Sequence, residues 1–307
     1  MADELEALIA GLSQPQKSVS PKYFYDEAGS VLFDEITRLP EYYLTGTELA
    51  IMRDNIAEMA ALVGPQASLI EFGSGSSYKT RLLLEHLEDL AAYVPVDISE
   101  EHLLASQQRV RQAFPHIDVL PVVADFTHPF QLPDPTTMPV RNLVYFPGST
   151  IGNFEHDDAM KLLRVMYQEA GQGGALLIGV DLQKDPEVIH AAYNDSAGVT
   201  ARFNLNMLTH LNRAFGADFD LDAYEHRATY RPDEGRVVVE LVSSHKQLVH
   251  IGDATITIAK DEAILTEYSH KYAIKTFAAM ANSAGFAVDR VWTDPREWFS
   301  VQLLVRD

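Results

Sequence analysis

Glycine and acidic residues at two neighbouring predicted strand ends have the types and spacing of a nucleoside-binding site. Residues 69–75 read Leu-Ile-Glu-Phe-Gly-Ser-Gly, an apolar strand that enters a glycine turn, and a helix is predicted after the turn. Gly73 and Gly75 have no Cβ, so the backbone there can approach a ligand closely. Asp97 ends the next apolar strand about 20 residues later, where a carboxylate can accept from both hydroxyls of a ribose. The pattern predicts a cofactor that contains a nucleoside.

The glycine turn also distinguishes between nucleoside cofactors. It lacks the third glycine of a dinucleotide fingerprint, and no Gly-Lys-Ser or Gly-Lys-Thr of a phosphate-binding loop follows it. A turn with no features for holding a pyrophosphate favours S-adenosylmethionine over NAD or ATP. A tight strand-to-helix turn without any ligand is the alternative that this stretch leaves open. The neighbouring serines lack the Gly-x-Ser-x-Gly setting of a serine nucleophile.

Two further segments place polar or aromatic side chains at predicted strand ends. Residues 122–126 read Val-Val-Ala-Asp-Phe, in which Asp125 can accept from an adenine amino group and Phe126 can pack near the ring. Residues 146–153 read Phe-Pro-Gly-Ser-Thr-Ile-Gly-Asn, a glycine-containing loop between a strand and a helix. Loops beyond the carboxyl ends of parallel strands are where α/β sheets bind their substrates.

Two segments that do not lie at these predicted strand ends are also candidates for binding residues. Residues 20–43 set tyrosines and phenylalanines beside polar turns before the first predicted strand. Residues 266–272 read Thr-Glu-Tyr-Ser-His-Lys-Tyr, and Glu267 and Ser269 share one side of this extended segment, because side chains alternate along a strand. In an arbitrary chain such aromatics are more often core residues, and such a glutamate more often faces solvent.

The composition limits the possible functions. The formal net charge of -20 disfavours sequence-independent binding of nucleic acid, since phosphates would be repelled. The chain has no cysteine, which excludes disulfides and thiolate chemistry, and its eleven histidines show no spacing typical of metal ligands. No apolar run reaches the roughly 18 residues of a membrane span, and the acidic first residues are unlike a secretory signal. We expect a cytoplasmic enzyme that acts on a small molecule, with no metal and no membrane partner.

Strands and helices alternate through the first half of the chain, which predicts a parallel sheet with crossover helices. The expected strands are 68–72, 93–97, 117–123, 142–146 and 175–181, and the expected helices are 48–63, 78–90, 99–113 and 155–171. A helical stretch at 186–215 and a β-rich region from 224 follow. A helix at 271–284 precedes two last strands that return to the first sheet. We therefore expect a doubly wound α/β sheet with an inserted, mainly antiparallel subdomain.

Five motifs occur together and in one order. They lie in residues 24–43, 73–80, 148–153, 191–204 and 266–272, and include Gly-Ser-Thr-Ile-Gly-Asn and Thr-Glu-x-Ser-x-Lys-Tyr. Over nearly its whole length the chain resembles the histidine-specific Nα-methyltransferases of ergothioneine biosynthesis. The resemblance implies a Rossmann-like methyltransferase sheet with an inserted α+β subdomain. It implies that 47–185 and 272–307 bind S-adenosylmethionine, while 1–46 and 186–271 bind the substrate.

The resemblance also implies roles for the residues that bind the cofactor. Gly73 and Lys79 would lie at its methionine end, with Lys79 facing the carboxylate. Asp97 would hold the ribose, and Asp125 and Phe126 the adenine. Tyr25 would lie near the line of methyl transfer and act, together with Asn153, in catalysis.

A second set of implied residues would bind the amino acid. Tyr42, Asn153 and Tyr193 would hold its amino and carboxylate groups. Gly148 and Phe33 would shape the site. Glu267 and Ser269 would recognise the imidazole, which offers a donor and an acceptor when neutral and two donors when charged.

Two positions depart from the family pattern. Val239 stands where the family usually has methionine near the substrate side chain, and Pro147 replaces a leucine. A smaller side chain at 239 would leave more room beside the ring of the substrate. We expect a monomer that converts L-histidine to the Nα,Nα,Nα-trimethyl product, and L-histidine remains the predicted substrate because Glu267 is retained. A larger aromatic amino acid such as a tryptophan derivative, a non-catalytic S-adenosylmethionine-binding protein and a nicotinamide-dependent oxidoreductase are the alternatives.

Overall fold

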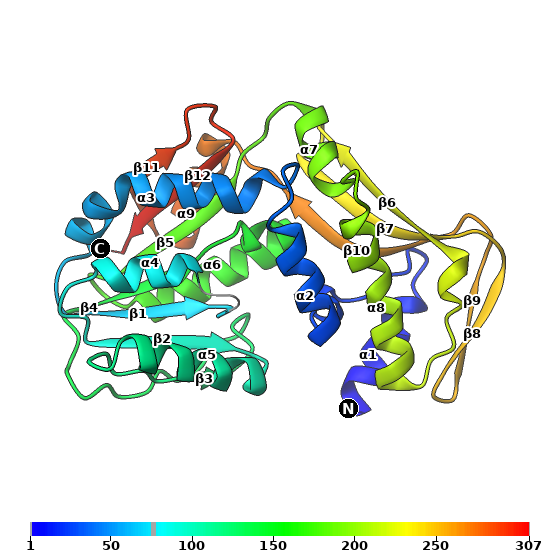
Figure 1. Ribbon diagram of the computed structural model, residues 1–307, viewed down its shortest axis with the longest axis horizontal. Coiled ribbons are helices and arrows are strands. Elements are labelled where there is room, and N and C mark those ends of the chain that lie inside the picture. The colour runs from blue at the N-terminus through cyan, green and yellow to red at the C-terminus, as the bar shows by residue number, and fades with distance from the viewer. Residues whose placement is uncertain (1, 75–77, 307) are drawn as a thin grey trace. The chain divides into compact units, whose positions relative to one another are not determined.

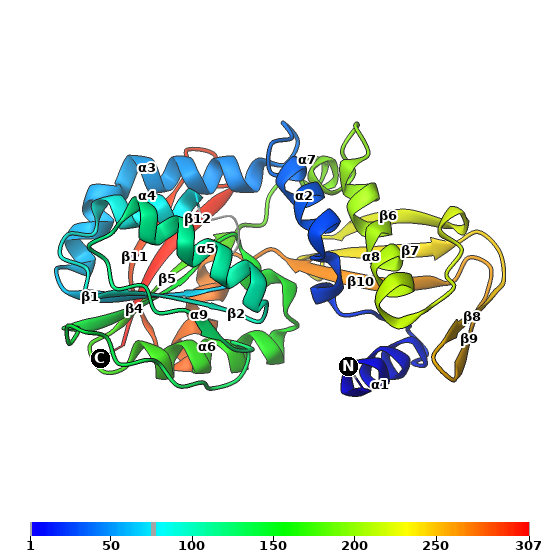
Figure 2. The same ribbon diagram turned by 60° about the horizontal axis from the view of Figure 1, so that its bottom comes forward.

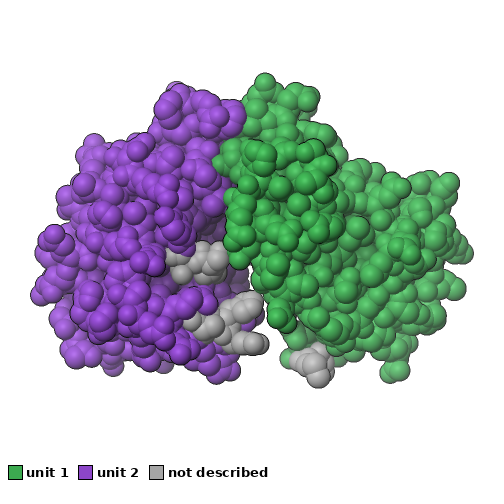
Figure 3. All heavy atoms as spheres, in the orientation of Figure 1, with its two compact units in different colours: residues 1–43, 184–270 green, residues 44–183, 271–307 purple. Residues whose placement is uncertain are grey.

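The computed structural model describes residues 2–74 and 78–306 (Figure 1). The chain folds into two compact units, and each unit combines segments that are distant in the sequence. Unit 1 consists of residues 1–43 and 184–270, and unit 2 consists of residues 44–183 and 271–307 (Figure 3). The chain therefore enters the second segment of each unit only after it has passed through a segment of the other unit.

Unit 2 is built on a seven-stranded sheet with the order β11-β12-β5-β4-β1-β2-β3. Its strands are β1 (Ala67–Phe72), β2 (Ala92–Asp97), β3 (Val122–Val123), β4 (Arg141–Phe146), β5 (Ala175–Asp181), β11 (Ala287–Thr293) and β12 (Phe299–Val305). Strands β1 to β5 are parallel, whereas β12 runs antiparallel to both β5 and β11. The strand order reverses between β1 and β4, and ligands of open α/β sheets bind at such a switch point. The predicted doubly wound α/β fold is confirmed.

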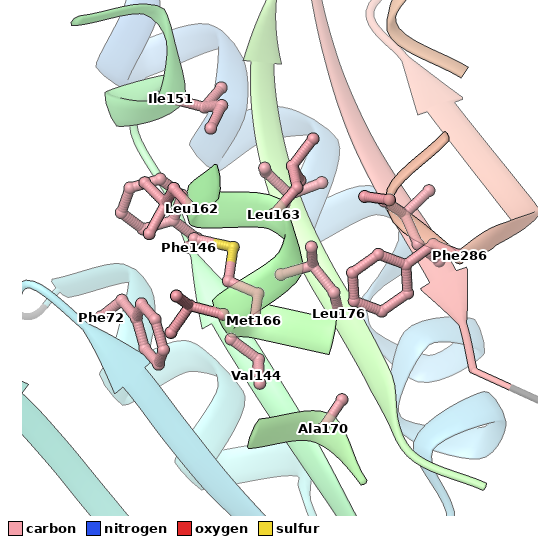
Figure 4. Packing of buried hydrophobic residues seen from close by; sticks show 14 of the residues in the cluster. Phe72, Val144, Phe146, Ile151, Leu162, Leu163, Met166, Ala170, Leu176 and Phe286 are labelled. Carbon is pink, nitrogen blue, oxygen red and sulfur yellow. The ribbon is translucent and has the colours of Figure 1, made fainter. Parts of the chain in front are cut away.

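Helices cover both faces of this sheet, as expected of a parallel sheet whose strands are buried on both sides. Figure 2 shows α3 (Tyr43–Val63), α4 (Tyr78–His86) and α5 (Glu100–Ala113) on one face, and α6 (His156–Ala170) and α9 (Ile274–Ala284) on the other. On the α6 side the core is closely packed. Figure 4 shows Met166 of α6 among Phe72, Phe146 and Leu176, which come from three different strands.

Unit 1 has a three-stranded antiparallel sheet with the order β10-β7-β6 and a separate hairpin of β8 and β9. The strands are β6 (Tyr224–Arg231), β7 (Arg236–Ser243), β8 (Gln247–Ile251), β9 (Ala254–Ile258) and β10 (Ala263–His270). The helices are α1 (Ala2–Leu12), α2 (Glu27–Ile36), α7 (Pro186–Tyr193) and α8 (Val199–Phe215), with short 3-10 turns η1 (Pro21–Phe24) and η3 (Leu221–Ala223). The apolar face of α8, which includes Met207, Leu208 and Leu211, packs in the same core as residues of β7 to β10.

Some element boundaries differ from the sequence expectation. The strand expected at 117–123 is reduced to β3, with one isolated bridge at Val119, because Pro121 has no N–H to donate to a ladder. The helical stretch expected at 186–215 breaks after Tyr193, where the Asp195 carboxylate accepts from the N–H groups of Val199 and Thr200 and so caps α8.

Two helix ends also differ. The helix expected over 78–90 ends at His86 as α4. The helix expected from 271 begins at Ile274, because Tyr272 is held in an extended bridge to Leu182.

Candidate active site

The turn after β1 has the conformation expected of a ligand-binding glycine. Gly73 has φ of 78°, in the left-handed region that glycine adopts without strain, and its N–H donates to the Val96 carbonyl at 2.9 Å. A Cβ on Gly73 would lie 3.7 Å from a ring carbon of Phe126, so the Phe126 ring lies beside the turn. Gly75, the second glycine of the motif, is outside the described residues.

The predicted cofactor residues lie at neighbouring ends of β1, β2 and β3. Asp97 ends β2 half-buried, and one of its oxygens accepts from the N–H of Ser99 at 2.9 Å. The Asp125 side chain is 51% exposed, and one oxygen accepts from both the N–H and the hydroxyl of Thr127. The Phe126 ring packs at centroid distances of 5.5 Å from Phe72 and 5.8 Å from Phe146.

This set of groups fits S-adenosylmethionine. The Asp97 carboxylate offers acceptors for the two hydroxyls of a ribose, and the Phe126 ring offers an apolar wall for an adenine. The turn at Gly73 has no Cβ to obstruct a ligand. The structure therefore brings together the cofactor residues that the sequence predicted at the carboxyl edge of the sheet.

Lys79, predicted to face the methionine carboxylate, is held by a glutamate that the sequence analysis missed. Glu48 of α3 is buried and accepts from the Lys79 ammonium at 2.5 Å and from the Gly148 N–H at 3.0 Å. Gly179 of β5 leaves the room for this carboxylate, because a Cβ there would lie 2.1 Å from Glu48 Oε1. Glu48 thus joins a predicted cofactor residue to a predicted substrate residue.

The loop that carries Gly148 and Asn153 is fixed by hydrogen bonds at several points. Ser149 has φ of 58°, a left-handed conformation that costs energy in a residue with a Cβ. Its hydroxyl accepts from the N–H of Asp181 at 2.9 Å, and the hydroxyl of Thr150 donates to the Pro147 carbonyl. Asn153 is half-buried at the end of a 3-10 turn, η2 (Thr150–Asn153). The loop presents Asn153 in a defined position.

Glu71, the acidic residue just before Gly73, has a different environment from Asp97. It is buried, and its two oxygens accept from the hydroxyls of Thr80 and Tyr93. Burial raises the pKa of the Glu71 carboxyl to about 7, although both hydrogen bonds act in the opposite direction. Glu71 therefore ties α4 and β2 to β1.

In unit 1, the structure brings the predicted imidazole-binding residues together. Glu267 of β10 is paired directly with Val239 of β7, and a bulge next to Glu267 shifts the register. A bulge re-aims the side chains beside it. The hydroxyls of Ser269 and Tyr193 are hydrogen-bonded at 2.7 Å, which joins β10 to the last residue of α7. Val239, Ser269 and Tyr193 are buried, whereas Glu267 is half-buried.

The predicted aromatic residues of unit 1 form a cluster around one further ring. Ring centroids lie 5.7 Å apart for Tyr25 and Phe33, and 6.4 Å apart for Phe33 and Tyr42. Phe203 of α8 contacts two of them, at 5.7 Å from Tyr25 and 5.8 Å from Phe33. Phe203 lies in the motif at 191–204, but its position there did not indicate a role.

The phenol of Tyr25 stays protonated. Although 41% of the residue is exposed, loss of solvation raises the pKa of its hydroxyl, and the negative charge of Glu267 and the nearby Tyr193 raise that pKa further. The influence of Glu267 and Tyr193 places Tyr25 in the same electrostatic environment as the imidazole-binding residues. A phenol in this state can accept or donate a hydrogen bond, but it cannot act as a phenolate base.

The comparisons with known proteins decide the family. The family model of the histidine-specific, S-adenosylmethionine-dependent methyltransferases matches residues 4–306. The chain belongs to this family. The histidine N-alpha-methyltransferase of Mycolicibacterium smegmatis is 41% identical over 97% of this chain and 93% of its own length. That of Mycobacterium tuberculosis is 38% identical over 97% of this chain and 94% of its own length. The chain is accordingly an S-adenosylmethionine-dependent methyltransferase, as the sequence predicted.

A longer relative also matches. The ergothioneine biosynthesis protein 1 of Neurospora crassa is 30% identical over 89% of this chain, and the match covers 32% of that protein. Within residues 2–74 and 78–306, no group of three or more His, Cys, Asp or Glu side chains is arranged to hold a metal ion. Among the helices of the described residues, none has the length and apolar character needed to cross a membrane.

Proposed function

We propose that this methyltransferase transfers methyl groups to the α-amino nitrogen of L-histidine, in three successive steps, to form Nα,Nα,Nα-trimethylhistidine. The proposal rests on the arrangement of residues on β7, β10 and α7. There Glu267 lies opposite Val239, and the Ser269 hydroxyl is hydrogen-bonded to that of Tyr193. Family membership over residues 4–306 supports the same substrate class.

The imidazole is recognised by complementary hydrogen-bonding groups. Glu267 accepts from one ring nitrogen, and Ser269 donates to or accepts from the other. A phenyl or alkyl side chain in the same place would shield the Glu267 carboxylate from water without offering it a donor, at a cost of about 1–3 kcal/mol. This penalty discriminates against amino acids whose side chains cannot form hydrogen bonds.

The remaining residues hold the reactants in place. Tyr42, Asn153 and Tyr193 bind the amino and carboxylate groups, with Gly148 and Phe33 shaping the site. When bound, S-adenosylmethionine supplies an electrophilic methyl group on a sulfonium. The residues that we assign to the cofactor, Gly73, Lys79, Asp97, Asp125 and Phe126, all lie in unit 2. Tyr42, Tyr193, Glu267 and Ser269, which we assign to the substrate, lie in unit 1.

The chemistry requires a neutral amine, because an ammonium ion has no lone pair. An apolar surrounding lowers the pKa of an amine, and the oxygens of Tyr25 and Asn153 accept from its N–H groups without a strong base. Each transfer would release S-adenosylhomocysteine, and the methylated ammonium would lose a proton to solvent before the next transfer. The amine thus loses its N–H donors, and the aromatic face of Tyr25 would interact with the permanent cation of the trimethyl product. The chain therefore provides orientation and proximity rather than covalent catalysis.

A larger aromatic amino acid is the second candidate substrate. Val239 is buried directly opposite Glu267, and a valine there occupies less volume than the methionine that is usual in the family. The retained Glu267 favours histidine. We also propose that the enzyme is a cytoplasmic monomer with small-molecule substrates. We propose no binding of nucleic acid, since the net charge of -20 repels phosphates.

Incubation of the enzyme with S-adenosylmethionine and each of the twenty amino acids, followed by mass spectrometry, tests the proposal. We expect methylated products from histidine, with the trimethyl form at long times, and little product from the others. Methylation of another amino acid in preference to histidine, or of none, would contradict the assignment.

Asn153→Ala should raise the KM for histidine strongly while S-adenosylhomocysteine still binds.

A further inference from the structure

The side chain of His226 on β6 contacts both α7 and α8. It is half-buried on β6, with Nε2 at 2.9 Å from the backbone carbonyl oxygen of Tyr193, the last residue of α7. Its Nδ1 is 2.9 Å from the side-chain nitrogen of Asn204 on α8. The ring therefore lies between the end of α7 and the first turns of α8.

The partners of Asn204 determine which nitrogen of His226 carries the proton. The Asn204 amide nitrogen also donates to the backbone carbonyl of Glu240 at 3.0 Å, so both of its hydrogens are used. A flipped amide would set Asn204 Oδ1 against the Glu240 carbonyl oxygen, with two acceptors facing each other. His226 Nδ1 must therefore accept, and the proton on Nε2 donates to Tyr193.

We propose that His226 is a positioning residue for substrate binding, which holds the Tyr193 main chain so that the Tyr193 hydroxyl meets Ser269. The inference rests on the proposed function, in which Tyr193 and Ser269 bind the substrate. A second tether acts at the same place, since Asn194 donates from its side chain to the Ala228 carbonyl at 3.1 Å. Together the two bonds fix the end of α7 on β6.

The electrostatic environment of His226 favours the neutral ring that this role requires. Burial lowers the pKa of His226, against smaller opposing effects of the Tyr193 carbonyl and of Asp195. Glu240, the charged residue of the facing β7 segment, is paired with Arg227 at 2.9 Å. The ring therefore remains neutral, as an acceptor for Asn204 and a donor to Tyr193.

Two substitutions at His226 separate positioning from simple stability. His226→Leu removes both hydrogen bonds, whereas the amide of His226→Gln still offers one acceptor and one donor. For the amino acid that the wild-type enzyme methylates fastest, we expect His226→Leu to raise KM about tenfold while kcat changes less than about twofold. We expect His226→Gln to restore most of the affinity, and both variants to bind S-adenosylhomocysteine as the wild type does.

Val249→Ala is the matched control, because Val249 is fully buried in the core of unit 1 and is not a partner of Tyr193. It should lower Tm but leave KM unchanged. A His226→Leu enzyme with lowered Tm and wild-type KM would overturn the inference, as would a His226→Gln enzyme as impaired as His226→Leu.

Nitrogen NMR of the unliganded protein tests the tautomer without any substrate. A proton on Nε2 is expected, and a proton on Nδ1 would contradict the inference. Failure of the wild-type enzyme to methylate histidine would refute the proposed substrate only, because the KM comparison uses whichever amino acid is methylated fastest and the NMR result needs none.

Discussion

Two carboxylates at neighbouring strand ends of unit 2 differ in what they can do. Both oxygens of Glu71 accept from protein hydroxyls, which makes its contribution structural. Asp97 lies half-buried at the end of β2, with one oxygen accepting from the N–H of Ser99, and it is the residue that we assign to the ribose. The sequence pattern contained both acids, and their hydrogen-bond partners distinguish the roles.

Removal of the Asp97 carboxylate should weaken cofactor binding. Each hydrogen bond from a ribose hydroxyl to a charged acceptor contributes about 1.5–3 kcal/mol. Asp97→Ala should therefore raise the Kd for S-adenosylhomocysteine, measured by calorimetry, by about tenfold or more. Asp54→Ala, at an exposed acid on α3, should leave the Kd unchanged. An unaltered Kd in Asp97→Ala would remove the assignment of Asp97.

The raised pKa of Glu71 makes stability depend on pH. A folded-state pKa of about 7, above the ordinary glutamate pKa of 4.5, means that the folded protein binds a proton that the unfolded chain has released. The stabilising contribution of this group is fully present below pH 4.5 and is lost as the pH rises through 7. Relative to Glu71→Gln, the wild-type free energy of unfolding should fall by an amount on the order of 2 kcal/mol between pH 5 and pH 8.

Denaturant unfolding of both proteins at the two pH values provides this measurement. The comparison is a difference between wild type and variant, so that the other titrating groups largely cancel. A difference in the free energy of unfolding that does not change with pH would show that Glu71 has an ordinary pKa in the folded protein.

At the scale of elements, the contact between α3 and β5 depends on the size of one residue. Gly179 leaves the room in which the Glu48 carboxylate meets Lys79 and Gly148. Gly179→Ala should lower the free energy of unfolding by about 1–3 kcal/mol through overpacking, and should also weaken the binding of S-adenosylhomocysteine.

Gly46→Ala is the matched control for Gly179→Ala. Gly46 lies in α3, and a Cβ there would meet nothing within 4 Å. Alanine at this helical position should raise the free energy of unfolding by about 0.5–1 kcal/mol. Chemical denaturation and calorimetry measure both variants. Gly179→Ala with unchanged stability and cofactor binding would show that the space occupied by Glu48 is not constrained.

The contact of Glu48 with Lys79 and Gly148 could not be predicted from the sequence, whereas the strands beside it could. The strands expected at 142–146 and 175–181 occur as β4 and β5, because a fully buried strand has a local apolar signal. Glu48 lies 31 residues from Lys79 and 100 residues from Gly148, so no local pattern could indicate their contact. Phe203 was missed for a related reason, since an aromatic residue on a helix has the pattern of an ordinary core residue.

At the scale of the whole molecule, the sequence order interleaves the two units. Unit 1 takes Tyr25, Phe33 and Tyr42 from the first segment of the chain and Tyr193, Glu267 and Ser269 from a segment that begins more than a hundred residues later. Periodicity predicted the doubly wound sheet and the inserted, mainly antiparallel subdomain, whereas only the resemblance of five separate motifs to one family implied that these particular residues act together. The roles assigned to these residues stay predictions until variants are measured.

Competition between histidine and tryptophan tests the central claim most directly. Equal concentrations of both amino acids are methylated by wild type, Glu267→Ala and Val239→Met, and the ratio of products gives the ratio of kcat/KM values. Glu225→Ala, at an exposed acid on β6, is the control. We predict that wild type prefers histidine, that Glu267→Ala lowers this preference by about tenfold or more, and that Val239→Met raises it. A wild-type enzyme that prefers tryptophan, or a ratio that Glu267→Ala leaves unmoved, would contradict the account.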